Sequence, residues 1–144
     1  MATSRILVAD DDEAVLESVT WLLQENGYDV VPANGGNACL EQLDRRSPDL
    51  LLLDILMPDA DGCQLLERIK GEERWRDLPV LMLSAQPPEE ASVRSLGLGA
   101  ADFIRKPYRP KELLARVPGI RATGPGARVL SNFINGWKTA PAQV

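Results

Sequence analysis

Four consecutive leucines at residues 50–53 lead directly into a carboxylate, Asp54. An apolar run of this length, bounded by polar residues, is typical of a strand that is buried on both faces of a sheet. Such a strand needs helices on both sides of it, so the run predicts an α/β fold with a parallel sheet. Asp54 would then lie at the carboxyl end of a central strand.

The rest of the chain alternates between short apolar runs and segments whose apolar residues have helical spacing. We expect a doubly wound sheet of five parallel strands, and Pro32 favours an edge position for the second strand. The expected strands are residues 5–9, 29–33, 50–53, 79–83 and 102–105, and the expected helices are residues 13–26, 37–46, 62–71, 88–96 and 110–117.

The length and composition fit one globular domain, with 144 residues, 44% of them hydrophobic and 26% charged. No apolar run approaches the ~20 residues that span a bilayer, and the N-terminus lacks the pattern of a secretion signal. The lack of histidine and the presence of only two cysteines exclude a zinc site and a disulfide framework. We therefore expect a cytoplasmic protein with reduced thiols and no membrane contact.

The net charge of −5 is unevenly distributed along the chain. Residues 118–144 carry three basic and no acidic residues, whereas the preceding part of the chain is strongly acidic. An acidic body argues against duplex nucleic acid as a direct partner, because contacts to phosphates need a basic surface.

Polar side chains lie at the carboxyl ends of four of the expected strands. Open parallel sheets bind ligands at this edge, where the strand order reverses. If the order is 2-1-3-4-5, the first and third strands are neighbours, and their acids converge on one pocket. The polar residues are Asp10, Asp11 and Asp12 after the first strand, Asp54 after the third, Ser84 after the fourth, and Lys106, followed by Pro107, after the fifth.

Converging carboxylates need a compensating cation, because two charges ~4 Å apart repel by about 4 kcal/mol at an effective dielectric constant of about 20. Mg²⁺ fits best, since it prefers hard oxygen ligands from a few carboxylates, water and phosphate. Lys106 would add a positive charge from the other side. With these cations and the hydroxyl group of Ser84, Asp54 is equipped to attack phosphorus and form an acyl phosphate.

Each of these polar residues also has a purely structural explanation. Asp11 or Asp12 could cap the helix that follows. Asp54 could cap the turn in LMPDADG, and Lys106 and Pro107 could form an ordinary surface turn. We favour a shared site, because separate explanations do not account for complementary polar groups at the ends of four strands.

Five stretches of the sequence form a specific pattern by their order and spacing. They are ILVADDDE (6–13), LLLLDILMPDADG (50–62), VLMLSA (80–85), LGAADFIRKPY (98–108) and KELLARV (111–117). In this pattern, residues 5 to about 117 resemble the receiver domain of two-component response regulators. The resemblance implies a flavodoxin-like sheet of five parallel strands in the order 2-1-3-4-5.

The resemblance implies a role for each residue of the acidic site. Asp54 matches the phosphoacceptor. Asp10 and Asp11 match the pair that holds Mg²⁺, with Asp54 and the backbone carbonyl of Leu56 as further ligands. Lys106 matches the lysine that contacts the phosphoryl group. Such a protein is not an enzyme in the usual sense, because it promotes only its own phosphorylation and dephosphorylation.

Other positions match residues that respond to phosphorylation in the family. Ser84 matches the hydroxyl residue that turns toward the phosphoryl group, and Phe103 matches the aromatic residue that then turns inward, with plain core packing as the alternative for Phe103. The peptide bond before Pro107 matches one that is usually cis. Leu56 and Gln86 match two positions that help to set the phosphoryl lifetime. Apolar Leu56 cannot orient an attacking water, which predicts slow self-dephosphorylation.

The resemblance also implies partners. A histidine kinase or phosphotransfer protein would donate the phosphoryl group. A downstream protein would bind the face formed by the expected helix 88–96, strand 102–105 and helix 110–117. The sequence leaves open whether the chain forms a homodimer, and whether it is a relay intermediate or a final effector.

The C-terminal part departs from the family pattern. Pro118 and Gly119 predict that the last helix ends at residue 117, because proline inside a helix costs ~3 kcal/mol or more. We expect a receiver domain over residues 1–118 and a linker and tail over residues 119–144, too short for an independent output domain. The tail holds a segment with helical spacing that could dock on the receiver, bind a partner or stay disordered, namely Leu130, Phe133, Ile134 and Trp137.

The leading interpretation is a stand-alone receiver, similar to chemotaxis receivers, that signals by protein contacts once Asp54 is phosphorylated. The alternative is an interaction module with the receiver fold that works without phosphorylation, but the complete acid and lysine set argues against it. An aspartyl phosphatase would need a second Asp where this chain has Leu56. A dinucleotide-binding enzyme would need a glycine-rich turn after the first strand, and DDDEAV has none.

Overall fold

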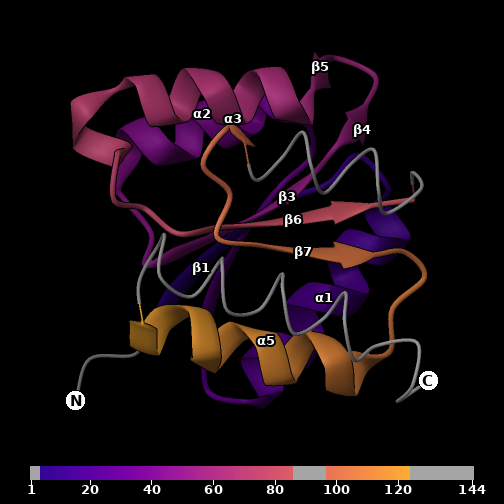
Figure 1. Cartoon of the computed structure of the whole chain (residues 1–144). Coiled ribbons are helices and arrows are strands. Elements are labelled where there is room, and N and C mark those ends of the chain that lie inside the picture. The colour runs from indigo at the N-terminus through magenta and orange to yellow at the C-terminus, as the bar shows by residue number, and fades with distance from the viewer. Residues whose placement is uncertain (1–3, 86–96, 124–144) are drawn as a thin grey trace.

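A five-stranded parallel sheet forms the centre of the computed structural model, which describes residues 4–85 and 97–123 (Figure 1). Its order is β2-β1-β3-β6-β7, which is the predicted order 2-1-3-4-5 when the strands of this sheet are counted along the chain. β2 lies at an edge, as Pro32 predicts. The strands are β1 (Arg5–Ala9), β2 (Asp29–Ala33), β3 (Leu50–Asp54), β6 (Val80–Ser84) and β7 (Asp102–Arg105).

Within the part of the chain that the structure describes, two pairs of helices cover the two faces of the sheet (Figure 1). α2 (Gly36–Arg45) and α3 (Gly62–Gly71) pack on one face, and α1 (Glu13–Glu25) and α5 (Pro110–Thr123) pack on the other. Each pair buries its apolar side in a separate hydrophobic cluster on its own face of the sheet. This layered arrangement confirms the predicted doubly wound fold.

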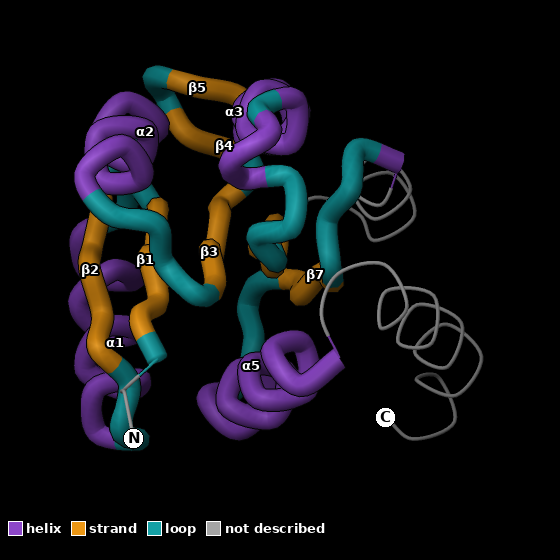
Figure 2. The backbone as a smooth tube through the Cα atoms, turned by 90° about the vertical axis from the view of Figure 1, so that its left-hand side faces the viewer, coloured by secondary structure: helices purple, strands orange, loops and turns teal. Residues whose placement is uncertain are grey.

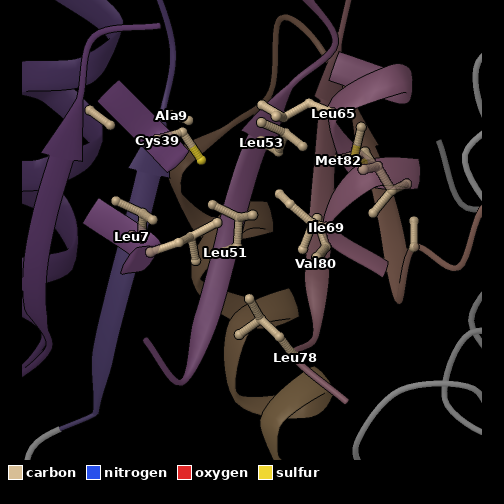
Figure 3. Packing of buried hydrophobic residues seen from close by; sticks show 14 of the residues in the cluster. Leu7, Ala9, Cys39, Leu51, Leu53, Leu65, Ile69, Leu78, Val80 and Met82 are labelled. Carbon is tan, nitrogen blue, oxygen red and sulfur yellow. The ribbon is translucent and has the colours of Figure 1, made fainter. Parts of the chain in front are cut away.

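The leucine run of β3 contributes to both clusters. Leu51 and Leu53 belong to the cluster under α2 and α3, whereas Leu50 and Leu52 belong to the cluster under α1 and α5. Figure 3 shows Leu51 and Leu53 between side chains from the neighbouring strands and helices. All four leucines are 0% exposed, so the prediction of a strand buried on both faces is confirmed. Each buried leucine stabilises the fold by about 1.5–3 kcal/mol.

A short hairpin that the sequence pattern did not predict follows β3. β4 (Leu56–Met57) and β5 (Ala60–Asp61) pair antiparallel and lie outside the main sheet, beside α2 and α3 (Figure 2). A short 3₁₀ helix, η1 (Glu73–Trp75), was also not predicted. Elements of two or three residues are too short to show a period in their apolar residues, so periodicity cannot reveal them.

The last described helix is longer than predicted. α5 continues through Pro118 to Thr123, so the prediction that Pro118 and Gly119 end the helix at Val117 is wrong. Leu113 and Val117 are fully buried against the sheet and hold the helix in place. Pro118 lies on the exposed side of α5, where water can bond the carbonyl that loses its backbone partner.

Some predictions concern residues outside the described ranges. They are the helix over residues 88–96, the lifetime position Gln86 and the tail segment with Leu130, Phe133, Ile134 and Trp137. The division into a domain over residues 1–118 and a tail over residues 119–144 also stays a prediction. None of the helices within residues 4–85 and 97–123 has both the length and the apolar character needed to cross a membrane.

Gly62, the first residue of α3, should not tolerate a side chain. A Cβ atom there would lie 2.3 Å from the carbonyl oxygen of Asp54 and 2.6 Å from the Cα of Ile55, so the backbone would have to move. We therefore expect Gly62→Ala to lower the free energy of unfolding by about 2–3 kcal/mol in a urea titration. Gly71→Ala is the matched control in the same helix, because a Cβ at Gly71 meets nothing within 4 Å. Equal stability of the two variants would contradict the close approach at Gly62.

Candidate functional site

Four strands of the sheet bring polar side chains to one edge. Asp10 directly follows β1, Asp54 is the last residue of β3 and Ser84 is the last residue of β6. Lys106 follows β7, and its backbone N–H donates a hydrogen bond to the carbonyl oxygen of Ser84 at 2.6 Å. β3 pairs with both β1 and β6, and β6 pairs with β7, so the four strand ends are neighbours. The convergence expected from the sequence is present.

Lys106 lies between two of the acids. Its Nζ atom is 2.8 Å from Oδ2 of Asp10 and 3.4 Å from Oδ1 of Asp54. One carboxylate oxygen from each of Asp10, Asp11 and Asp54 lies within 4.8 Å of the other two. Asp10 and Asp54 are almost fully buried, whereas Asp11 is closer to solvent. The acids therefore form a buried cluster that is accessible from the side of Asp11.

Burial and charge together set the protonation of this cluster. Burial raises the pKa of Asp54 from 3.8 to about 6; the charge of Asp10 adds to the rise and Lys106 opposes it. Burial alone would lower the pKa of Lys106, but its hydrogen bonds and its attraction to Asp10 and Asp54 outweigh burial and raise that pKa. Lys106 therefore stays an ammonium group, and its single charge balances only part of the charge of the acids.

The unbalanced negative charge fits a hard divalent cation. Clustered carboxylate oxygens are the ligand type that Mg²⁺ prefers, together with water and phosphate oxygens. A cation held by Asp10, Asp11 and Asp54 would also oppose the repulsion that raises the pKa of Asp54. The residues at this edge thus fit Mg²⁺. The predicted fourth ligand, the carbonyl of Leu56, belongs to the hairpin directly after β3, and its role stays a prediction.

The structure also describes three other predicted site residues, Pro107, Ser84 and Phe103. The peptide bond between Lys106 and Pro107 is cis, as predicted. Ser84 is fully buried at the end of β6. Phe103 on β7 is half-buried and packs against the cluster under α2 and α3, so both the switch role and plain core packing remain open for it. The roles of Ser84 and Phe103 in switching stay predictions.

Asp12 begins the helix that leaves the site. It is the N-cap of α1, and its Oδ1 atom accepts hydrogen bonds from the backbone N–H groups of Ala14 (2.9 Å) and Val15 (3.3 Å). The capping role that the sequence left open therefore belongs to Asp12. The backbone N–H of Asp12 in turn donates to Oδ1 of Asp10 at 3.0 Å, which orients that buried carboxylate.

Asp59 makes a contact that the sequence pattern did not predict. From the turn between β4 and β5, its carboxylate accepts hydrogen bonds from the backbone N–H groups of Gly36 (3.0 Å) and Asn37 (3.1 Å) at the start of α2. These bonds lower the pKa of Asp59. One signal was available in the sequence, because Gly35 and Gly36 supply no side chain that could cap the expected helix.

Comparison with known sequences identifies relatives of the chain. The sequence profile of the response regulator receiver domain family matches residues 6–118. The phosphate regulon transcriptional regulatory protein PhoB of Escherichia coli is 42% identical over 116 residues, which cover 81% of this chain and 51% of PhoB. The response regulator MprA of Mycobacterium leprae is 42% identical over 122 residues, which cover 84% of this chain and 53% of MprA. The chain spans about half the length of these curated relatives.

Solved structures with the same fold support this relationship. A putative response regulator from Chloroflexus aurantiacus has a TM-score of 0.80 and 36% identity, and the match covers 84% of this chain and 99% of that one. A CheY-like response regulator receiver domain protein from Methanospirillum hungatei has a TM-score of 0.79 and 32% identity, with 84% and 95% covered. The predicted resemblance and fold class are therefore confirmed.

Replacement of Asp54 by its neutral isostere should stabilise the metal-free protein. At about pH 7.5 Asp54 is charged in surroundings that raise its pKa to about 6, so its charge opposes folding. We expect Asp54→Asn to increase the free energy of unfolding by roughly 1–2 kcal/mol, measured by urea titration with a chelator present. Saturating Mg²⁺ should reduce or reverse the difference, because the cation stabilises the wild type more than the variant.

The same difference should depend on pH. Between about pH 4 and pH 6 the folded protein binds more protons at Asp54 than the unfolded chain, so its stability falls as the pH rises through this range. The advantage of Asp54→Asn should therefore be largest at about pH 7.5 and shrink toward about pH 4. Glu41→Gln removes an exposed charge on α2 as a control and should show neither effect. A variant no more stable than the wild type at neutral pH would contradict the raised pKa.

Proposed function

This chain belongs to the receiver domains of two-component response regulators, and we propose that its Asp54 accepts a phosphoryl group in a Mg²⁺-dependent reaction. The observation that carries the proposal is the position of Lys106 Nζ between Asp10 and Asp54, at 2.8 Å and 3.4 Å. A fixed cation in a largely buried site can stabilise charge on a transferring phosphoryl group more strongly than water can.

Asp54 would act as the nucleophile of the reaction. One carboxylate oxygen forms a bond to phosphorus while the bond from phosphorus to the donor atom breaks, and the donor atom keeps that electron pair. The carboxylate is the reacting form, so no proton has to leave Asp54 above its pKa of about 6. Lys106 would orient the phosphoryl oxygens and balance their charge. Mg²⁺ held by Asp10, Asp11, Asp54 and the Leu56 carbonyl would supply further neutralisation of charge.

The phosphoryl group would alter the surface through two neighbouring side chains. The acyl phosphate carries about two negative charges in place of the single charge of the Asp54 carboxylate, so the buried edge of the sheet gains about one. The hydroxyl group of Ser84 would turn toward the phosphoryl group, and the half-buried ring of Phe103 would move into the space that Ser84 leaves. The face formed by β7 and α5, together with the helix predicted over residues 88–96, would then bind a downstream protein with altered affinity.

A histidine kinase or phosphotransfer protein would donate the phosphoryl group, and we place the reaction in the cytoplasm. The receiver would signal by protein contacts, including contacts to a second copy, and would not bind nucleic acid or membrane directly. PhoB, a transcriptional regulatory protein by name, is about twice as long as the segment that matches this chain. We propose in addition that this chain, unlike PhoB, acts as a receiver without an output domain. The alternative is an interaction module that works unphosphorylated, and the complete set of Asp10, Asp11, Asp54 and Lys106 favours phosphorylation over it.

Incubation with Mg²⁺ and acetyl phosphate should add the mass of one phosphoryl group to the wild type and nothing to Asp54→Asn. Asp12→Asn is a matched control at the same sheet edge, because asparagine caps a helix as well as aspartate does, and this variant should be phosphorylated. Intact mass spectrometry measures all three proteins. An adduct on Asp54→Asn would contradict the assignment of the acceptor. A metal-binding wild type that takes no phosphoryl group from acetyl phosphate or a histidine kinase would favour the unphosphorylated module.

The phosphorylated protein should lose its phosphoryl group slowly, over minutes or longer. The side chain at position 56 is 53% exposed beside the site, but leucine offers no group that could orient an attacking water. Leu56→Asn supplies such a group and should shorten the lifetime, which is followed by intact mass after removal of acetyl phosphate. A wild-type half-life of seconds would contradict this prediction.

A further inference from the structure

The base of the β4–β5 hairpin is attached to α3. The backbone N–H of Gly62 donates to the carbonyl oxygen of Ile55 at 2.7 Å, which closes the hairpin directly after the phosphoacceptor strand. Asp61 is the N-cap of α3 and accepts hydrogen bonds from the N–H groups of Cys63 (2.8 Å) and Gln64 (3.3 Å). The base is therefore fixed to one helix by bonds that are local in sequence.

The tip of the hairpin is attached to a different helix through Asp59. The N-cap of α2 is Gly35, which has no side chain, and the first N–H groups of this helix need other acceptors. Asp59 provides them, with Oδ1 bonded to the N–H of Gly36 and Oδ2 bonded to the N–H of Asn37. A carboxylate at the amino end of a helix also interacts favourably with the helix dipole.

The two glycines allow this contact because they leave room for it. Gly35 has a φ angle of +112°, and a Cβ there would lie 3.0 Å from Oδ1 of Asp59. A Cβ on Gly36 would lie 2.5 Å from the Cβ of Ala60 on β5. Figure 2 shows the hairpin lying beside the helices α2 and α3. The backbone of α2 therefore approaches the hairpin more closely than a chain with side chains at these positions could.

The predicted metal ligand of the hairpin, Leu56, lies at its base. Met57 packs into the core, but the side chain of Leu56 is 53% exposed and does not fix its own backbone. Leu56 pairs with Asp61 at the base, and Met57 pairs with Ala60 next to the tip. Each strand of the hairpin has only two residues, so Leu56 at the base is close in sequence to the tip that Asp59 attaches to α2.

We propose that Asp59 is a positioning residue for the metal-dependent phosphorylation, an inference that rests on the proposed function. By joining the hairpin tip to α2, Asp59 restricts the movement of the hairpin whose Leu56 carbonyl would be a ligand of Mg²⁺. Without Asp59 the hairpin keeps its anchors at Met57 and Asp61, so the metal site becomes weaker but is not lost.

The test compares Mg²⁺ affinity, measured by calorimetric titration of the full chain, in the wild type, Asp59→Ala and Asp59→Asn. Asp49→Ala is the matched control, because Asp49 also accepts a backbone N–H, that of Arg5 at 2.7 Å, but near the opposite end of β3. We expect Asp59→Ala to weaken Mg²⁺ binding roughly tenfold, as losses of groups that orient metal ligands do. Asp59→Asn keeps an acceptor oxygen without the charge, so its loss should be smaller, roughly threefold. Asp49→Ala should bind Mg²⁺ like the wild type.

The rate of phosphorylation by acetyl phosphate gives a second measurement. Asp59→Ala should be slower than the wild type at low Mg²⁺ concentration and recover most of its rate at saturating Mg²⁺, because the defect lies in metal binding. Faster hydrogen exchange at the amides of Gly36 and Asn37 would verify that the variant has lost the bonds to α2. A general loss of stability would instead affect Asp59→Ala and Asp49→Ala alike.

Equal Mg²⁺ affinity of folded Asp59→Ala and the wild type would overturn the inference. If Asp59→Ala does not fold, Asp59→Asn decides, and an affinity equal to that of the wild type overturns the inference in the same way. A wild type that binds Mg²⁺ but is never phosphorylated would overturn the proposed function alone, because the Mg²⁺ comparison still decides the role of Asp59. A wild type that binds no Mg²⁺ would overturn both.

Discussion

The burial of β3 on both faces is the constraint from which the chemistry of the site follows. Asp54 is the last residue of this strand and is only 4% exposed, so its charge lies where water stabilises it little. Asp10 adds a second buried carboxylate from the neighbouring strand, and the ammonium group of Lys106 lies between them. Because the fold supplies one cation for several clustered acids, this edge of the sheet favours the binding of a second cation. With that cation bound, the edge can also accept a group that carries further negative charge.

Much of this architecture could be predicted from the sequence, because it depends on patterns that are local. The run at residues 50–53 and the alternation of strands and helices indicate a doubly wound sheet, and the carboxyl ends of parallel strands lie at one edge. The convergence of Asp10, Asp54 and Lys106 follows from that geometry if the strand order is 2-1-3-4-5, and the family resemblance implies this order. The cis bond before Pro107 does not follow from that geometry, and it was predicted only from the family resemblance.

The features that the sequence did not predict depend on contacts between distant segments. The local cost of Pro118 predicted a helix end, but α5 continues through Pro118 to Thr123. Asp59 caps a helix that begins 23 residues before it, and capping rules look for an acceptor next to the helix. The choice between Asp11 and Asp12 as a cap also required the backbone geometry, which shows Asp12 in this role.

The two residues joined by the bond from Lys106 to Asp10 are 96 positions apart in the chain. Among the strands of the described residues, β7, which directly precedes the lysine, is synthesised last, and it lies at the sheet edge opposite β2. A nascent chain that has folded only its first strands would hold the acids without their fixed cation. The partial balance of charge at this edge of the sheet therefore arises late in biosynthesis, after the acids have been synthesised.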